Sequence, residues 1–384
     1  MVDIFLNELN SLLWYEWLLL GLFGVFYLLK IIYLLLFNAR VIFQRKTPQT
    51  GIVPLSLILT YRNEEENLKK NLAGILSELN SGSEIVAVDD YSQDNSLSVL
   101  GVLREKYPGL KVSSLNQETR YSEKMAKNIA MKAASNDWVM VIPPGLTEPP
   151  ADWLNSVASK MNTEKEVIVN YLNIKRQRGF SQMLIRNEYF YQQLKSFGFI
   201  LNRISYLSFE ENVAFKKEIY FRKGGFGHHI KEYYANFELI LNDFIKKKKT
   251  HINFGSGTAI RKEMSVKKSD FFELMKKEIR IRKNLTFSKR LILFFEKWLT
   301  LLFYFSVLIV IIYFQVLWPV ILILVLLYIF TFAFIIKIGL NRLNERKLFL
   351  SSLGYALFIP IFKWFYQAYY YYSSRRKQKW KSKE

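Results

Sequence analysis

The sequence predicts an α/β domain with a mostly parallel sheet, carried in the cytosol between transmembrane helices at both ends of the chain. Three observations predict this fold class. Apolar residues are concentrated near the two ends, the middle alternates β-rich runs with segments of helical spacing, and basic residues follow the apolar stretches. The 384 residues are 51% hydrophobic, and 54 basic against 33 acidic residues give a net charge of +21. So much apolar material excludes a disordered chain.

Composition also limits the partners and the metal chemistry. A large positive charge is typical of nucleic-acid binding, but membrane proteins place the same residues at the cytoplasmic lipid surface. Here the basic residues follow the membrane boundaries and no nucleic-acid reader motif is present, so we expect a lipid membrane as partner and no nucleic acid. Without cysteine, a disulfide scaffold and a cysteine-based metal site are excluded.

The first apolar stretch, Trp17–Phe37, has Lys30 as its only charge. It is long enough for one helix across a hydrocarbon core of ~30 Å, which takes about 20 residues. The preceding residues include Asp3 and Glu8, whereas a signal peptide begins with basic residues. We therefore predict a retained anchor.

The apolar residues near the other end predict a membrane hairpin followed by a different kind of helix. Two spans, Trp298–Leu317 and Pro319–Ile336, are joined by an uncharged turn. A further stretch, Phe349–Tyr372, contains Pro360 and ends in four tyrosines, which favours an interfacial or re-entrant helix over a lipid-buried one.

Basic residues follow the first span, the third span and the last apolar stretch. By the positive-inside rule all three groups are cytosolic, so the middle domain is cytosolic and the last stretch does not cross. The cysteine-free, lysine-rich and aromatic composition favours a bacterial inner membrane. These basic residues are Arg40, Arg45, Lys46, Lys337, Arg342, Arg346, Lys347 and six within Arg375–Lys383. The predicted domains are an anchor (1–46), a cytosolic α/β domain (50–290), a transmembrane hairpin (291–347) and an aromatic segment with a basic tail (348–384).

The middle of the chain alternates predicted strands with predicted helices, which is typical of crossover units and a parallel sheet. The strands are Leu55–Thr60, Glu84–Asp89, Lys111–Leu115 and Trp138–Ile142. The helices are Glu64–Asn80, Asp94–Tyr107, which Asp94 caps, and Ser122–Ala134.

Ligands of open parallel sheets bind outside the carboxyl ends of the strands. The residues at those ends, together with later segments, resemble a known family. SLILTYRNEEENL, IVAVDDYSQDNS, SEKMAKNIAMKAASNDWVMV and ENVAFKKEIYFRKGGF occur in this order. They are similar to segments of family 2 glycosyltransferases of the membrane-anchored branch, which have the nucleotide-sugar-binding GT-A fold. The resemblance extends from about Leu55 to Asn284.

The resemblance implies a nucleotide pocket. Tyr61 and Glu64 would line it, Asp89 and Asp90 would hydrogen-bond the base and ribose, and Lys124 would reach toward the base or diphosphate. The residues themselves allow another interpretation. Asp89 and Asp90 can cap the following turn, and Lys124 can be a solvated helix charge.

The chain departs from the family where the metal is held. The family's Asp-x-Asp motif holds a divalent cation on the sugar diphosphate, but Pro143, Pro144 and Gly145 occupy these positions. None offers the carboxylate oxygens that Mg²⁺ or Mn²⁺ prefers, and the nearest acid is Glu148. We therefore expect no metal cofactor.

Two further catalytic motifs of the family are altered. The acidic pair that supplies the general base aligns with residues 234–237, which contain no acid, although Glu232 and Glu238 flank them. Of the Gln-x-x-Arg-Trp motif only Arg280 remains. Glu232 and Arg280 are thus the candidate catalytic residues.

These departures leave two function classes open. One is a membrane-bound transferase moving a sugar from a nucleotide donor to a lipid or glycan, impaired or rebuilt with cations. Residues 243–290 hold 15 basic and 5 acidic residues, including Arg261, Lys262 and Arg282, which can stabilise a leaving diphosphate or face anionic lipid. The other is a non-catalytic glycosyltransferase-like protein acting as scaffold or partner subunit of a membrane complex.

Overall fold

The computed structural model describes residues 12–44, 51–119, 121–147, 149–161, 164–246, 248–314, 317–345 and 347–381. Contacts divide the chain into two compact units. The apolar unit comprises Met1–Ile42, Thr286–Asn341 and Arg346–Glu384, and the α/β unit comprises Phe43–Leu285 and Arg342–Glu345. Each is described separately.

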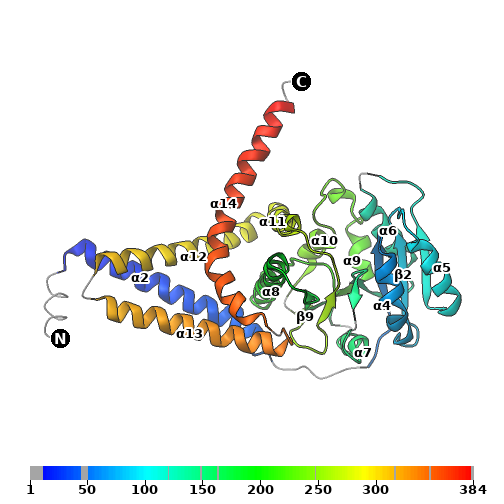
Figure 1. The fold of residues 1–384 in the computed structure, drawn as a ribbon, viewed down its shortest axis with the longest axis horizontal. Helices are drawn as coiled ribbons and strands as arrows, with labels where there is room; N and C mark the ends of the chain where they lie inside the picture. Colours follow the sequence, from blue (N-terminus) through cyan, green and yellow to red (C-terminus); the bar gives the residue numbers. More distant parts are fainter. Residues whose placement is uncertain are drawn as a thin grey trace. The chain divides into compact units, whose positions relative to one another are not determined.

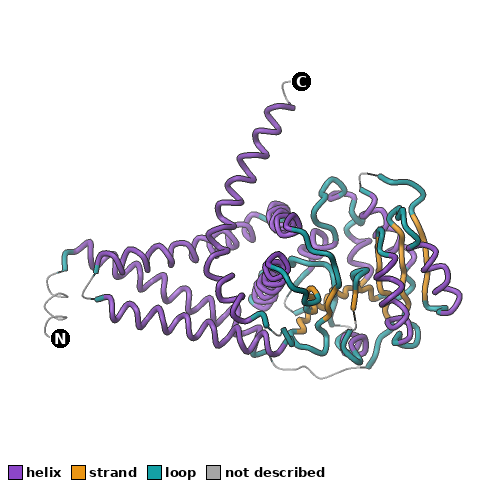
Figure 2. The backbone as a smooth tube through the Cα atoms, in the orientation of Figure 1, coloured by secondary structure: helices purple, strands orange, loops and turns teal. Residues whose placement is uncertain are grey.

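A seven-stranded sheet forms the core of the α/β unit (Figure 2). Its strand order is β3-β2-β1-β4-β8-β6-β9. The first four strands are parallel, β8 runs antiparallel to both neighbours, and β9 is parallel to β6. The expected mostly parallel sheet is therefore confirmed. The strands are β1 (Leu55–Tyr61), β2 (Glu84–Asp89), β3 (Leu110–Ser114), β4 (Trp138–Ile142), β6 (Val167–Asn170), β8 (Val213–Lys216) and β9 (Thr250–Asn253).

The apolar strands form because crossover helices cover them on both faces. All residues of β2 and β4 are buried, and all but one of β1. This is why these strands read as continuous hydrophobic runs. The crossover helices are α4 (Glu65–Ser77), α5 (Ser96–Lys106) and α6 (Ser122–Ala133), and α6 packs on β1 and β2.

The second half of the α/β unit adds a small sheet, in the order β5-β10-β7, and further helices. Strand β10 (Ile260–Lys262) pairs antiparallel with β5 (Leu146–Thr147) and parallel with β7 (Leu172–Ile174). The helices are α7 (Trp153–Ala158), α8 (Phe180–Leu201), α9 (Lys217–Arg222), the 3₁₀ turn η2 (Gly227–His229), α10 (Phe237–Phe244) and α11 (Lys268–Lys283).

The apolar unit is helical (Figure 1), and four of its helical segments are long and apolar enough to cross a membrane. Phe23, Phe303 and Ile321 belong to its small core, whereas about half of its large apolar side chains are exposed. The helices are α2 (Trp14–Tyr33), the π-helical turn η1 (Leu34–Ala39), α3 (Arg40–Ile42), α12 (Phe287–Tyr313), α13 (Trp318–Arg342) and α14 (Phe349–Lys381).

The orientation stays a prediction, and part of its basis lies outside the described residues. This applies to Asp3, Glu8, Arg45, Lys46 and Arg346, and to the side chains of the basic tail. The predicted first and third spans fall within longer helices. Helix α12 begins and ends earlier than the predicted second span, at Phe287 and Tyr313 instead of Trp298 and Leu317.

Candidate functional site

A cavity of about 370 Å³ lies where the sequence places the ligand, at the carboxyl ends of β1, β2 and β4. The start of α6, the residues before β8 and a loop before α10 complete its wall. Its lining residues are Thr60, Tyr61, Arg62, Asp90, Tyr121, Ser122, Glu123, Lys124, Lys127, Val141, Ile142, Pro143, Pro144, Glu210, Glu211, Glu232, Tyr233 and Asn236.

The two aspartates at the end of β2 have different roles. Asp89 accepts hydrogen bonds from the backbone N–H of Ser92 (3.1 Å) and from its hydroxyl, and it does not line the cavity. It caps the turn, as the alternative interpretation allowed. Asp90 lines the cavity, burial raises the pKa of its carboxyl group, and its Oδ1 is a buried oxygen without a hydrogen-bond partner in the described structure. Asp90 is thus the aspartate that remains for a ligand.

Tyr61 and Glu64 are less available than the family resemblance implies. Tyr61 lines the cavity but is 2% exposed, so its ring is almost entirely covered. Burial raises the pKa of its hydroxyl, which has no hydrogen-bond partner among the described residues. Glu64 is absent from the cavity wall and accepts a hydrogen bond from Asn67 Nδ2 at 2.5 Å. Burial raises the pKa of Glu64 as well.

Lys124 is a structural cation. It is 3% exposed, so it is not a solvated helix charge. Its Nζ donates to the carbonyls of Glu232 and Ala235 (2.8 Å to Ala235) and to Asn236 Oδ1 (2.8 Å). Burial lowers its pKa. Lys124 therefore holds the loop 232–236 against α6, and its ammonium group is engaged there rather than directed at a diphosphate.

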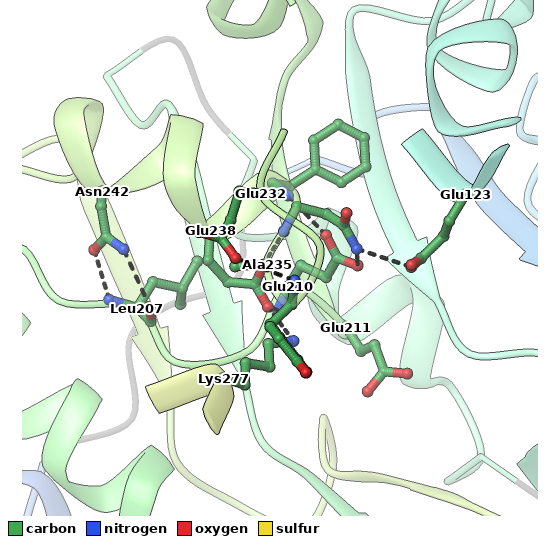
Figure 3. A network of polar contacts seen from close by, with 12 residues as sticks. Glu123, Leu207, Glu210, Glu211, Glu232, Ala235, Glu238, Asn242 and Lys277 are labelled. Atoms are coloured by element: carbon green, nitrogen blue, oxygen red, sulfur yellow. Dashed lines mark hydrogen bonds and ion pairs between the residues drawn. The ribbon is translucent and has the colours of Figure 1, made fainter. Parts of the chain in front are cut away.

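Buried ion pairs lie beside this loop, and Figure 3 labels Lys277 and Glu238, which form one of them. Lys127 contacts Glu123 and Glu210, each at 2.5 Å, and Lys277 contacts Glu238 at 2.5 Å. Burial opposes ionisation of Glu210, but Lys127 and Lys277 outweigh it and lower its pKa to about 2. Burial raises the pKa of Glu238. Glu238 is wholly buried, so it cannot replace the missing base at the cavity.

The two candidate catalytic residues bind each other. Arg280 Nε lies 3.1 and 2.9 Å from the two carboxylate oxygens of Glu232, and a terminal nitrogen lies 2.8 Å from Oε2. Asn284 Nδ2 donates to the same carboxylate at 3.4 Å. The structure thus brings both predicted residues together, but in an ion pair that engages both oxygens of Glu232.

The residues at the family's metal position do not fit a divalent cation. Pro143 and Pro144 line the cavity and offer no side-chain oxygen. A Cβ on Gly145 would lie 2.2 Å from the carbonyl oxygen of Glu263, whose N–H donates to the Gly145 carbonyl at 2.7 Å. Glycine is therefore required there. Within the part of the chain that the structure describes, no three acidic or histidine side chains are grouped to hold a metal, and Glu148 lies outside that part.

Several basic residues that could have replaced the metal are engaged elsewhere. Lys262 contacts both carboxylate oxygens of Glu211 at 2.7 Å. Arg261 donates to the carbonyls of Leu343 (2.9 Å) and Asn344 (3.2 Å). Neither of them lines the cavity, and neither does Arg282.

Sequence reasoning missed five charged residues of the cavity wall, namely Arg62, Glu123, Lys127, Glu210 and Glu211. Glu123 and Lys127 are four residues apart on α6, a spacing that places them on one face and that could have been read from the sequence. Nothing in the sequence shows that Glu210 is buried beside them.

Comparisons with known proteins agree with this fold. The sequence model described as Glycosyl transferase family 2 matches residues 56–267. One similar solved structure is the mannosyltransferase PcManGT from Pyrobaculum calidifontis in complex with GDP-Man and Mn²⁺. It shares 14% identity at a TM-score of 0.51, covering 88% of this chain and 98% of that one. At this identity the likeness concerns the fold alone.

Two other structures resemble a smaller part of the chain. TarS residues 1–349 from S. aureus share 17% identity at a TM-score of 0.41, covering 60% of this chain and 65% of that one. Mannosyl-3-phosphoglycerate synthase from Rubrobacter xylanophilus shares 14% identity at a TM-score of 0.42, covering 62% and 76%. No curated protein sequence matches the chain.

Proposed function

Because the chain belongs to glycosyl transferase family 2, we propose that it is a membrane-bound member that keeps the donor-binding cavity but not the family's metal-dependent transfer chemistry. It acts as a ligand-binding partner subunit of a membrane complex. Its α/β unit is cytosolic, and the membrane is a bacterial inner membrane. The charge pattern of the sequence and the four apolar helices support this location.

The Glu232–Arg280 ion pair carries the proposal. Sugar transfer by in-line displacement needs a base for the acceptor hydroxyl and positive charge on the leaving diphosphate. Glu232 and Arg280 are the residues left for these tasks, and their side chains form an ion pair with each other. Asn236 at the aligned base position cannot accept the proton, and its side-chain oxygen already accepts a hydrogen bond from Lys124.

The charges of the cavity wall support the same conclusion. Five carboxylates line it against three cations. All three cations are engaged, since Arg62 pairs with Glu118 at 2.8 Å, Lys124 holds the loop and Lys127 holds two glutamates. A diphosphate would gain little from such a wall without a metal, because like charges repel. The nucleoside end of a donor is better suited, since Asp90 can accept hydrogen bonds from its N–H or hydroxyl groups.

The test is turnover and binding by the full chain in detergent. We expect no hydrolysis or transfer from UDP-, GDP- or CMP-sugars, with or without Mn²⁺. We expect one nucleoside or nucleotide to raise the melting temperature equally with Mn²⁺ and with EDTA. A ligand that binds only the folded chain and is present at a hundredfold excess over its Kd raises the unfolding free energy by ~2.7 kcal/mol. Turnover that Glu232→Gln or Arg280→Gln abolishes would overturn the proposal.

A second outcome separates binding from catalysis. If the chain turns nothing over and no nucleotide shifts its melting temperature, the catalytic part of the proposal stands and the donor-binding part is wrong. Asp90→Asn distinguishes a specific ligand from a general stabiliser, because it removes the carboxylate at the cavity and should abolish the shift. Asp152→Asn, an exposed aspartate outside the cavity wall, should leave the shift unchanged.

A further inference from the structure

A band of polar residues crosses the helices of the apolar unit. Lys30 of α2 is 7% exposed, and its Nζ donates to Thr300 Oγ1 of α12 at 3.2 Å. Tyr33 donates to Glu296 Oε1 at 3.4 Å. Placing charged groups at the centre of a bilayer is costly. The charged side chains of this band, Lys30 and Glu296, therefore fit a membrane boundary better than the hydrocarbon core.

Helix α14 meets α12 at this same level. Lys297 Nζ donates to Gln367 Oε1 at 2.5 Å. The rings of Trp298 and Trp364 meet edge to face with centroids 6.4 Å apart. Tryptophan and tyrosine are enriched at membrane–water interfaces. We call this group the polar belt, which comprises Lys30, Tyr33, Glu296, Lys297, Trp298, Thr300, Trp364 and Gln367.

The depth of the polar belt follows from helix geometry. Helices α12 and α13 meet at a turn near Leu317, which packs in the core of the apolar unit. Lys297 lies 16 residues before Tyr313, the last residue of α12, which corresponds to about 24 Å of helix. This is most of the thickness of a hydrocarbon core, ~30 Å. The turn and the polar belt thus mark the two faces of one bilayer.

The first part of α14 begins and ends at the depth of the belt. Its first residue, Phe349, lies under the ammonium group of Lys337 at 4.8 Å from the ring centroid. The rings of Phe303 in α12 and Tyr328 in α13 meet with centroids 5.1 Å apart. Because the two helices are antiparallel, Lys297, six residues before Phe303, and Lys337, nine residues after Tyr328, lie at depths that differ by about 5 Å. Gln367, 18 residues and about 27 Å further along α14, contacts Lys297. Both ends of the stretch Phe349–Gln367 therefore lie near the same depth. A helix with this property runs across the direction of α12 and α13 rather than parallel to them.

The path of α14 in the structure agrees with this count. Figure 1 shows α2, α12 and α13 running alongside one another, with α14 crossing α12 steeply. Between these ends the Ala356 carbonyl accepts a hydrogen bond from Tyr304 at 3.1 Å. Pro360 lies inside the helix, and α14 is the least hydrophobic of the four candidate spans.

We infer that α14 does not cross the membrane but lies in the interface on the side of the polar belt, with the boundary between lipid headgroups and acyl chains as its partner. Its exposed rings suit this boundary, because aromatic side chains combine an apolar body with a polar edge. The exposed apolar and aromatic side chains are Leu350, Leu357, Phe358, Ile361, Phe362, Phe365, Tyr369, Tyr371 and Tyr372.

Single-cysteine labelling tests this inference, because the natural chain contains no cysteine. Ser373→Cys reports the end of the apolar stretch of α14, Phe349–Ser373. Ser81→Cys, in an exposed turn of the α/β unit, and Tyr313→Cys, at the hairpin turn, mark the two sides. With a membrane-impermeant maleimide applied to cells and to inverted vesicles, we expect Ser373→Cys and Ser81→Cys to be labelled from one side and Tyr313→Cys from the other. Labelling of Ser373→Cys from the Tyr313 side would overturn the inference.

A depth measurement keeps the test decisive where a variant labels poorly. Nitroxides at Phe358→Cys and Phe365→Cys in the reconstituted full chain should show similar, shallow depths by collision with oxygen and with a polar nickel complex. Depths near the centre of the bilayer at both sites would mean that α14 crosses, because positions 358 and 365 lie on either side of the middle of the apolar stretch Phe349–Ser373. Protection from both reagents, together with cross-linking between copies, would identify a second chain as the partner and overturn the lipid assignment.

Discussion

Lys127 is buried between the carboxylates of Glu123 and Glu210, and all three residues line the cavity. Lys127→Met keeps the apolar stem but leaves Glu210 without its closest cation. Breaking a buried pair in this way costs about 3–5 kcal/mol of unfolding free energy. We expect a loss of this size in denaturant titrations of the purified protein.

The matched control is Lys69→Met. Lys69 pairs with Glu65 on the surface of α4, and exposed pairs contribute about 0–1 kcal/mol. Equal losses for Lys127→Met and Lys69→Met would show that the buried network is not a source of stability.

Gly145 decides whether the family's metal site can be restored. Gly145→Asp places a Cβ 2.2 Å from the backbone carbonyl of Glu263, so β5 and β10 must separate. We expect a lower melting temperature and no Mn²⁺-dependent shift, even with Pro143→Asp in the same chain. Gly74→Ala is the control, because a Cβ at this position inside α4 meets no other atom. This substitution should raise the unfolding free energy by about 0.5–1 kcal/mol. A Mn²⁺-stabilised Gly145→Asp variant would contradict this account.

Asp90 should make stability depend on pH. Burial raises its pKa in the folded state, so the folded chain holds the proton more tightly than the unfolded chain does. The stability that Asp90 contributes is therefore present at low pH and lost as the pH rises through the raised pKa. We expect Asp90→Asn to melt higher than the natural chain at neutral pH. The difference should shrink as the pH falls toward the ordinary value of 3.8, and a difference independent of pH would argue against this origin.

At the scale of elements, Lys124 connects α6 to the loop that carries Glu232. Lys124→Met leaves two backbone carbonyls and the Asn236 amide oxygen without this donor. Each buried acceptor without a partner costs about 1–3 kcal/mol, so the loop should open to regain solvent. We expect faster hydrogen exchange at residues 232–236, with α6 still protected. Lys132→Met, on an exposed position of α6, should leave that exchange unchanged.

The first half of the α/β unit was predictable because its elements are local. The runs Glu84–Asp89 and Trp138–Ile142 are strands with the predicted bounds, since each is continuously apolar and covered on both faces. The second half was not predicted. Strands such as β5, β7 and β10 have two or three residues, and each pairs with residues distant in the sequence. Short strands leave too little pattern to be recognised.

The site was predictable in position but not in its pairings. Parallel strands bring their carboxyl ends to one edge, which is why Tyr61 and Asp90 line the same cavity. Asp89 and Asp90 are adjacent, and only the geometry of the turn shows which of them faces the cavity. The Glu232–Arg280 pair joins residues 48 positions apart, and no periodicity reports such a contact.

For the whole molecule, the α/β unit is discontinuous in sequence. The predicted domain ends at residue 290, whereas the structure adds Arg342–Glu345, which begin at the last residue of α13. The Glu345 side chain is fully buried, 2.6 Å from Arg186 and 3.3 Å from Arg261. The complete α/β unit therefore includes four residues that the ribosome adds only after α12 and nearly all of α13.

Arg186 turns this dependence into a prediction whose sign changes with context. In the full chain Arg186 is 5% exposed, and in a fragment of residues 51–285 it loses its partner Glu345. Replacing it by an apolar side chain should then raise the unfolding free energy, so Arg186→Met stabilises the fragment. In the full chain the same substitution should destabilise, because Glu345 keeps only its longer contact with Arg261.

Denaturant titrations of the four proteins measure both signs. Arg261 needs no replacement in the fragment, because its side chain is 29% exposed and can reach solvent. If Arg186→Met destabilises both the fragment and the full chain, Arg186 is held by packing of its stem rather than by Glu345. If Arg186→Met stabilises the fragment and destabilises the full chain, Glu345 is the residue that neutralises the buried Arg186. The chain supplies Glu345 only after α12 and α13.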